Sequence, residues 1–401
     1  MTDRLRPDRR ALLKGAAATA ALAAAPVFVP TRFAIGQTAK LKLGLMLPYS
    51  GTYAQLGEAI TNGLKLAVQE AGGRLGGREI DYAVVDDESE PAKAPENANK
   101  LVNRDKVDFL VGTVHSGVAL AMAKVARDTD TMLVIPNAGA DAITGPLCAP
   151  NIFRSSFSNW QPAFPMGKVV ADRGLKNAVT LSWKYAAGEE STGGFKEGLT
   201  KAGGKVVKEL WLPFPNVEFQ PLLTEIAAAR PDVVYVFFAG GGAVKFVKDY
   251  AAAGLKDKIP LVGPGFLTDG TLEAQGEAAQ GLETTLHYGD GLDLPKNKSF
   301  IEAYRKAYGR DPDVYAVQGY DAGQLIAAGL GAVKGDTGAR KDLVAAMEKA
   351  EIDSPRGRFT ISKAHNPVQD IYLRKVVGTE NRVTGVAHKA LADPARGCKM
   401  A

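Results

Sequence analysis

The chain has 401 residues and a formal net charge of +5. Residues 1–39 carry six basic and two acidic side chains, so the charge of residues 40–401 is near +1. A near-neutral chain has no electrostatic reason to bind nucleic acid or an anionic membrane surface. The remaining length of about 360 residues exceeds the ~250–300 at which one hydrophobic core usually divides, which predicts two domains.

The N-terminus has the pattern of an export signal. Arg9 and Arg10 precede an apolar, alanine-rich run from Gly15 to about Val29. A basic segment followed by such a run is typical of a signal peptide, and the paired arginines resemble a twin-arginine (Tat) signal. The run is short for a membrane span of ~20 strongly apolar residues, so an uncleaved anchor is the weaker alternative. We expect residues 1–39 to be a Tat-type signal peptide and the protein to work in the periplasm.

Strand-like apolar runs alternate with helix-like segments from residue 41 to residue 263. This alternation predicts βαβ units and parallel sheets, and it occurs as two separate series, 41–153 and 176–263. After residue 286 the pattern turns mainly helical. The expected strands are 41–47, 80–85, 109–111, 132–135, 178–183, 206–212, 233–238, 261–262, 358–361 and 371–376, and the expected helices are 57–71, 91–104, 118–127, 189–202, 219–230, 243–253, 300–308, 315–333 and 340–349.

The order of several short motifs is more specific than any one of them. The chain reads LGLMLPYSGTYAQLG at 43–57, GGR at 76–78, DDESEP at 86–91, PNA at 136–138 and FRS at 153–155. This order resembles the periplasmic leucine/isoleucine/valine-binding protein family over residues 41–378. Members of that family are substrate-binding subunits of ATP-binding-cassette (ABC) importers.

The resemblance implies an α/β fold of the type I periplasmic binding protein class. In that fold, two doubly wound, Rossmann-like lobes are joined by three crossover segments and close on a ligand. The implied partners are a small carboxylate ligand, an inner-membrane ABC permease and its ATPase, and the implied state is a monomer without a cofactor. The expected N-terminal lobe is 40–156 plus 287–364, the C-terminal lobe is 157–286 plus 365–392, the tail is 393–401, and the crossovers lie near 155–159, 283–287 and 364–368.

The resemblance also places the carboxylate-binding groups. Family members hold the ligand carboxylate with a serine after the third strand and with backbone amides after the fourth, here Ser116 and the amides of Ala138, Gly139 and Ala140. Free N–H groups at a helix start attract an anion, which supports this placement. The alternative is that Ser116 only caps its own helix. His115 would point into the same cleft, unless it is structural.

Two departures from the family indicate the kind of ligand. Amino-acid-binding members place an acidic residue after a proline of the second lobe, where this chain has Gly265, and an aromatic residue in the segment that here contains Gly241. A buried ammonium group without a counter-charge costs several kcal/mol. We therefore expect an acid without an amine, with room for a ring. The candidate ring contacts are Tyr53, Phe157, Trp160, Tyr185 and Phe266, and Asn159 and Gln318 are candidates for reading a distal hydroxyl.

Three alternatives stay open at this point. Glu283 or Asp321 could supply the missing acid, which would make the protein a branched-chain amino-acid or amide binder of the same importer class. The fold also serves ligand-sensing receptor modules. An exported hydrolase is disfavoured because position 114 is Val114, so Ser116 is not in a GxSxG motif. The four histidines, at 115, 287, 365 and 388, have no metal-site spacing.

The chain has two cysteines, Cys148 and Cys398. Their spacing matches neither a metal site nor a redox CxxC motif. In an oxidising compartment two cysteines can pair, although two free thiols are the alternative. We expect a disulfide that fastens the C-terminal tail to the body of the protein.

Overall fold

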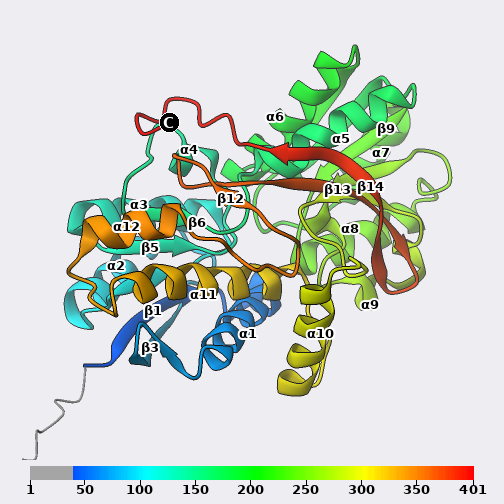
Figure 1. Cartoon of the computed structure of the whole chain (residues 1–401). Helices are drawn as coiled ribbons and strands as arrows, with labels where there is room; N and C mark the ends of the chain where they lie inside the picture. Colours follow the sequence, from blue (N-terminus) through cyan, green and yellow to red (C-terminus); the bar gives the residue numbers. More distant parts are fainter. Residues whose placement is uncertain (1–38) are drawn as a thin grey trace, which may run out of the picture. The chain divides into compact units, whose positions relative to one another are not determined.

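Two β-sheets organise the part of the chain that the structure describes (Figure 1). The structure is a computed structural model that describes residues 39–401, which form one compact unit. The expected signal peptide lies outside the described residues, apart from residue 39, and stays a prediction. No helix within residues 39–401 combines the length and apolar character that a membrane crossing needs.

The first sheet has six strands in the order β2-β3-β1-β4-β5-β6, and all pairs except β2–β3 are parallel. Its central strands are buried on both faces, as parallel strands between two helical layers should be. Helices α1, α11 and α12 cover one face, and α2 and α3 cover the other. The strands are β1 (Leu41–Leu47), β2 (Arg74–Leu75), β3 (Arg78–Asp86), β4 (Phe109–Val111), β5 (Met132–Ile135) and β6 (Ile152–Arg154), and the helices are α1 (Ala54–Glu70), α2 (Ala94–Asn99), α3 (Ser116–Thr129), α4 (Asp141–Thr144), α11 (Val314–Ala332) and α12 (Arg340–Glu348).

The second sheet has eight strands in the order β12-β13-β11-β10-β9-β7-β8, and β14 pairs with β13. Helices α5 and α6 pack on one face, and α7 and α8 pack on the other. Its strands are β7 (Asn177–Trp183), β8 (Lys205–Leu212), β9 (Val233–Phe237), β10 (Leu261–Pro264), β11 (Glu283–Leu286), β12 (Thr360–Ile361), β13 (Pro367–Val377) and β14 (Glu380–Leu391), and the remaining helices are α5 (Trp160–Asp172), α6 (Ala186–Lys201), α7 (Gln220–Ala229), α8 (Gly240–Ala252), α9 (Leu272–Gln275) and α10 (Pro295–Tyr308).

Several elements differ from the sequence-based expectation. Residues 283–286, expected in a crossover, form β11 and pair with β10 and β13. Strand β14 and helix α5 were not expected at all, because β14 is mostly polar and α5 contains Pro162 and Pro165. Pro162 is the third residue of α5, where its missing N–H removes no helical hydrogen bond. Helix α2 begins at Ala94 rather than at residue 91.

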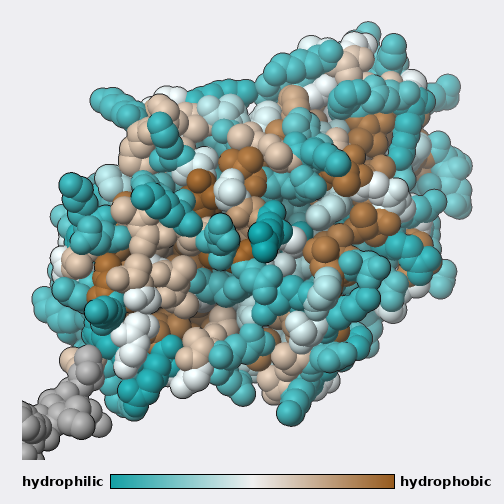
Figure 2. Space-filling view, viewed as in Figure 1, coloured by the Kyte–Doolittle hydropathy of each residue, from teal (hydrophilic) through white to brown (hydrophobic). Residues whose placement is uncertain are grey.

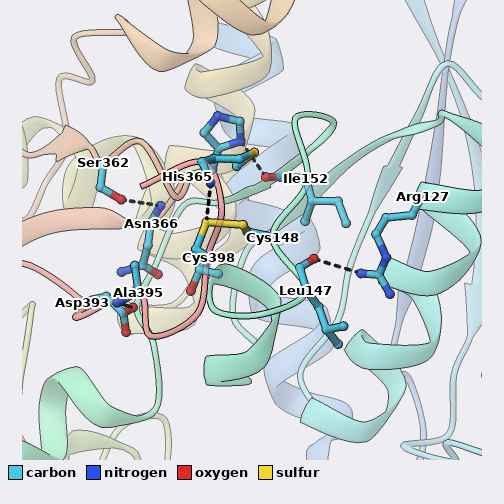
Figure 3. The surroundings of a disulfide bond; sticks show 12 residues. Arg127, Leu147, Cys148, Ile152, Ser362, His365, Asn366, Asp393, Ala395 and Cys398 are labelled. Carbon is cyan, nitrogen blue, oxygen red and sulfur yellow. Dashed lines mark hydrogen bonds between the residues drawn. A yellow bond between two sulfur atoms is a disulfide. The ribbon is translucent and has the colours of Figure 1, made fainter.

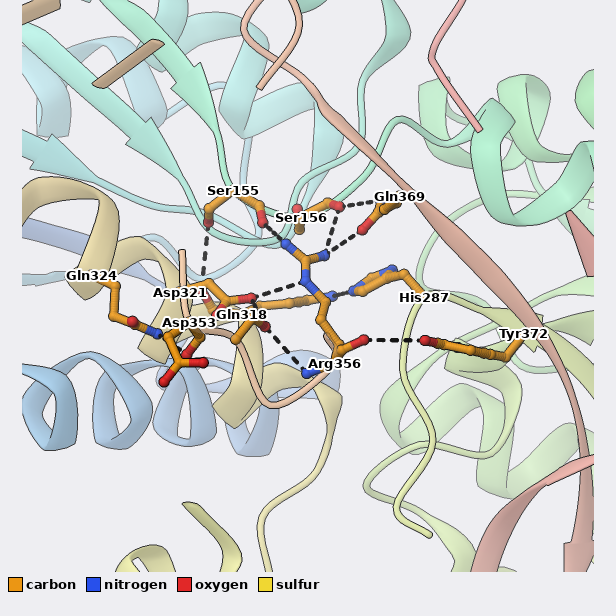
Figure 4. A network of polar contacts seen from close by, with 11 residues as sticks. Ser155, Ser156, His287, Gln318, Asp321, Gln324, Asp353, Arg356, Gln369 and Tyr372 are labelled. Atoms are coloured by element: carbon orange, nitrogen blue, oxygen red, sulfur yellow. Dashed lines mark hydrogen bonds and ion pairs between the residues drawn. The ribbon is translucent and has the colours of Figure 1, made fainter. Parts of the chain in front are cut away.

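We call the elements built on the first sheet the first half of the molecule and those built on the second sheet the second half. Segments that run between the halves meet at Arg356, which is buried (Figure 4). Its Nη1 donates to Ser156 O at 3.1 Å and to Gln369 Oε1 at 2.6 Å, and its Nε lies 3.0 Å from Asp321 Oδ2. One guanidinium therefore ties together segments that are more than 150 residues apart in sequence. The exact lobe boundaries stay a prediction.

The expected disulfide is confirmed. Cys148 and Cys398 are bonded, with their Cα atoms 5.6 Å apart and a sequence separation of 250 (Figure 3). The tail is also held by Arg396, whose Nη2 lies 2.8 Å from Glu197 Oε2. Because Cys148 follows α4 and Glu197 lies on α6, the tail is fastened to both halves of the molecule.

Hydrophilic side chains predominate on the face that Figure 2 shows, and apolar side chains form separate small patches between them. Within residues 39–401, the large apolar side chains exposed by more than a third are Val84, Leu147, Val207, Val377 and Val386. These residues come from different elements, as scattered surface apolar residues normally do.

Candidate ligand-binding site

A small cavity lies where the carboxyl ends of strands from both sheets face each other. Ligands of open α/β sheets bind at this end of the strands. The cavity has a volume of about 20 Å³, which is room for about one water molecule. Typical pockets for drug-sized ligands are ~300–1,000 Å³, so an organic ligand can enter only if the walls move apart. The lining residues are Tyr53, Leu56, Val114, Ser116, Asn137, Gly139, Phe157, Asn159, Tyr185, Ala187, Phe237, Ala239, Phe266 and Tyr315.

A larger cavity, of about 840 Å³, is lined by many charged residues, including Asp269, Asp290, Asp313 and Arg310. Its lining comes mainly from loops and from α10, and it contains neither Ser116 nor Gly139. The small cavity is therefore the candidate ligand site, because the carboxyl ends of strands from both sheets converge there.

Aromatic rings form most of the cavity wall. The rings of Phe157 and Phe266 lie 4.7 Å apart between centroids. The hydroxyl groups of Tyr53 and Tyr185 are 2.9 Å apart and join the two halves across the cavity edge. Phe237 at the end of β9 and Tyr315 on α11 complete this wall, and neither was a candidate from the sequence.

The polar end of the cavity consists of Ser116, Asn159 and Gly139. Asn159 Nδ2 donates to Ser116 Oγ at 3.2 Å, and the Asn159 backbone N–H donates to Gly139 O at 2.7 Å. The backbone N–H groups of Gly139 and Ala140 make no hydrogen bond to another described residue. The N–H of Ala138, by contrast, donates to Thr113 O at 2.9 Å. Of the three expected amides, Ala138 is therefore already occupied.

Neighbouring His115 caps helix α3, which corrects the idea that Ser116 is the cap. His115 Nδ1 accepts a hydrogen bond from Gly117 N at 3.1 Å, and Ser116 is the first helical residue. The imidazole stacks on Tyr185 with ring centroids 4.4 Å apart, so it lies at the contact between the halves and does not line the cavity. Burial lowers the pKa of His115 to about 4, so the ring is neutral at pH 7.

Trp160 and Gln318 point away from the cavity. The Trp160 indole donates to Glu197 Oε2 at 2.8 Å and stacks on Phe164 at 4.5 Å. Gln318 Oε1 accepts from Asn137 Nδ2 at 2.7 Å, and its Nε2 lies 3.3 Å from His287 Nε2 (Figure 4). Both side chains have their polar groups occupied elsewhere, so neither is in place to read a ligand hydroxyl or to pack on a ring.

The two informative glycines do not widen the cavity as expected. A Cβ atom at Gly265 would lie less than 3.0 Å from Arg374 Nη2 and from Leu286 Cβ, so this position faces a buried ion pair and a core side chain. Gly241 is exposed, and its nearest neighbour across the gap is Thr52. The missing side chain lets the core of the second half pack closely at Gly265 and lets Thr52 of the first half approach at Gly241, and at neither position does it make room for a ring.

The candidate acids from the sequence are also absent from the cavity. Glu283 is paired with Arg173, and Asp321 lies 3.0 Å from Arg356 Nε. None of the residues that line the cavity is acidic. The cavity therefore offers no counter-charge to a ligand ammonium group.

Comparison with known proteins identifies the family. Residues 40–381 match the family model described as "Periplasmic binding protein". The chain belongs to the periplasmic binding protein family. This periplasmic binding protein is 31% identical over 351 residues to Leu/Ile/Val-binding protein homolog 6 of Brucella melitensis, covering 85% of this chain and 88% of that relative.

Two solved structures of ABC-transporter solute-binding proteins resemble this periplasmic binding protein. One, from R. palustris in complex with benzoate, has a TM-score of 0.88 and 56% identity and covers 90% of this chain and 100% of that one. The other, from Rhodopseudomonas palustris BisB5 in complex with 3,4-dihydroxybenzoic acid, has a TM-score of 0.83 and 34% identity and covers 88% and 99%. The expected family, the type I fold and the solute-binding rather than enzymatic role are confirmed.

Proposed function

We propose that this protein binds a single-ring aromatic carboxylate in the periplasm and delivers it to an inner-membrane ABC permease and its ATPase. The observation that carries the proposal is the cavity itself: six aromatic rings, a serine hydroxyl beside free backbone amides, and no acidic side chain. The benzoate and dihydroxybenzoate found in the two related structures support the same ligand class. We further propose that it acts as a monomer whose lobes are 40–156 plus 287–364 and 157–286 plus 365–392.

The carboxylate belongs at the polar end of the cavity. Ser116 Oγ accepts a hydrogen bond from Asn159, so the hydroxyl hydrogen of Ser116 is available to a ligand. Gly139 lines the cavity and Ala140 follows it in sequence, and the N–H groups of both lack a partner among the described residues. Hydrogen bonds to an ionised group contribute about 1.5–3 kcal/mol each, so these three donors account for carboxylate selection.

The ring belongs between Phe157, Phe266, Tyr53, Tyr185 and Phe237. The Tyr315 hydroxyl is buried at the cavity wall and makes no hydrogen bond to another described residue. A buried hydroxyl without a partner costs free energy, which a hydroxyl on the ligand ring would recover. A benzoate that carries a ring hydroxyl is therefore a second candidate, favoured by Tyr315 in particular.

A branched-chain amino acid fits this cavity less well. The curated relatives carry leucine, isoleucine and valine in their names, but an amino acid brings an ammonium group. Burying that group without a carboxylate nearby costs several kcal/mol. The Glu190 carboxylate bonds to Asn159 at the end where the ligand carboxylate is proposed to lie.

A thermal-unfolding screen tests the proposal. Purified protein without its signal is heated with benzoate, 4-hydroxybenzoate, leucine or valine. A ligand at 100 times its Kd stabilises the folded state by about 2.7 kcal/mol. We expect the benzoates to raise the melting temperature and the amino acids to leave it unchanged. Stabilisation by leucine alone would contradict the proposed ligand class.

A further inference from the structure

Glu190 belongs to the second half of the molecule but reaches the polar end of the cavity. Glu190 lies on α6 and is partly buried. Its Oε2 accepts two hydrogen bonds, one from Asn159 Nδ2 at 2.7 Å and one from the Asp141 backbone N–H at 3.0 Å. Asn159 directly precedes α5 and belongs to the same half as Glu190, whereas Asp141 begins α4 on the first half, so the bond to Asp141 forms only on closure.

The bond to Asn159 determines which way its side-chain amide faces. An ionised carboxylate only accepts hydrogen bonds, so Asn159 must present its NH₂ group to Glu190. The second hydrogen of that NH₂ group then points to Ser116 Oγ, 3.2 Å away. If the amide were turned over, its oxygen would face Ser116 and would take the hydroxyl hydrogen that the ligand needs.

We propose that Glu190 is a positioning residue for the carboxylate site. It fixes the amide of Asn159, and on closure that amide meets Ser116 on the first half and directs the Ser116 hydroxyl hydrogen towards the ligand carboxylate. The inference rests on the proposed function, because it concerns how the same site recognises an aromatic acid. It couples the movement of the second half to the orientation of a donor on the first.

The charges around Glu190 are compatible with this role. Burial raises the pKa of Glu190, and the guanidinium of Arg154 acts in the opposite direction. Burial and the Glu190 carboxylate raise the pKa of Asp141 well above its ordinary value. Asp393, on the tail held by the disulfide, adds a further negative charge. Arg154 is fully buried and donates to Asn366 Oδ1 at 2.7 Å, so it is a fixed positive charge beneath the acids.

Three variants separate the acceptor role of Glu190 from its charge and its packing. Both hydrogen bonds go to the same oxygen, so Glu190→Gln can reproduce them with its single carbonyl oxygen. Glu190→Met keeps the length of the side chain but removes the acceptor. Glu189→Ala, at the exposed neighbouring position, is the matched control. Glu190→Ala repeats the acceptor-free test should Glu190→Met fail to fold.

The measurement is the Kd for benzoate and its dissociation rate, alongside the melting temperature of each ligand-free variant. We expect Glu190→Met to weaken benzoate binding by about tenfold, mainly through faster dissociation, because one charge-assisted hydrogen bond no longer orients the site. Glu190→Gln should stay within about threefold of the wild type, and Glu189→Ala should match it.

The outcomes distinguish this inference from the proposed function. A wild-type protein that binds no benzoate would contradict both. A wild type that binds benzoate, with Glu190→Met binding equally well, would overturn the role of Glu190 alone. A Glu190→Gln variant as weak as Glu190→Met would also overturn it, because the charge rather than the hydrogen-bond acceptor would then be the essential feature.

Discussion

The contact between Gly240 and Thr52 gives a sharp test of how the two halves close. Gly240 begins α8 with a φ of +54°, and a Cβ atom there would lie less than 3.0 Å from the backbone oxygen of Thr52. Thr52 follows β1 on the first half, and Gly240 follows β9 on the second. Because the neighbour is backbone, it cannot rotate away, and Gly240→Ala must hold the halves apart at this point.

The free-energy cost of Gly240→Ala has two parts, one that lowers stability and one that weakens ligand binding. The left-handed backbone costs an alanine about 1–2 kcal/mol whether the halves are open or closed, so it lowers stability without changing affinity. The steric contact exists only on closure, and an inserted methyl group in a packed region costs about 1–3 kcal/mol. That range corresponds to a benzoate Kd about five- to 150-fold weaker.

Two control variants separate these parts. Gly254 also has a positive φ, +65°, but a Cβ there would meet nothing within 4 Å, so Gly254→Ala carries the backbone cost alone. Gly241→Ala would place its Cβ 3.3 Å from Thr52 Oγ1, which a small adjustment of that side chain can accommodate. Calorimetry with benzoate should show a large loss for Gly240→Ala only. Equal affinities for Gly240→Ala and Gly254→Ala would refute the closure contact.

Three further predictions concern stability and export. Reduction of Cys148–Cys398, which closes a loop of sequence separation 250, should lower the free energy of unfolding in urea by up to about 5 kcal/mol, and an unchanged value would contradict a stabilising bridge. Burial, and after it the charge of Asp269, raises the pKa of Asp290 to about 6 from its ordinary 3.8. The stability that the protonated Asp290 carboxyl contributes is therefore complete below about pH 4 and is lost as the pH rises through 6. Asp290→Asn should therefore flatten the decline in unfolding free energy between pH 4 and 7, and an unaltered pH profile would argue against the raised pKa. Replacing Arg9 and Arg10 by lysine should leave uncleaved precursor in the cytoplasm, and normal periplasmic protein would contradict the twin-arginine signal.

Elements with a strong local pattern could be predicted from the sequence. The bounds of β1, β4 and β5 agree with those expected, because β4 and β5 are short continuous apolar runs and β1 is apolar apart from the exposed Lys42. Helix α5 was missed because two prolines hide its periodicity, although one stands in the first turn and the other is accommodated inside the helix. Strand β14 was missed because its mostly polar side chains alternate between exposed and partly buried positions, so it has no continuous apolar run.

The candidate site was predictable mainly from the family resemblance and from aromatic residues near the strand ends. Ser116 and Gly139 were expected from the resemblance, Tyr53, Phe157, Tyr185 and Phe266 were candidate ring contacts and Asn159 was a candidate polar contact, and all of them line the cavity. Tyr315 was not a candidate for the cavity, because it stands near the start of α11 and only the tertiary fold brings that helix to the second half.

The roles of Glu190 and of the glycines depend on geometry that local sequence does not carry. The partners of Glu190, Asn159 and Asp141, are 31 and 49 residues away. The sequence reveals that Gly265 lacks a side chain, but not that the missing Cβ would face Arg374 instead of the ligand. Side-chain direction at a strand end is set by packing across the two sheets, which no local pattern encodes.

The central claim is that the cavity selects a carboxylate on a ring and offers nothing to an ammonium group. Calorimetric titration of benzoate and of leucine into the same preparation, with Ser116→Ala beside the wild type, tests it most directly. We expect micromolar or tighter binding of benzoate, no heat from leucine, and about tenfold to hundredfold weaker benzoate binding by Ser116→Ala, the loss of one charge-assisted hydrogen bond. Micromolar leucine or valine binding with no response to benzoate would contradict the claim.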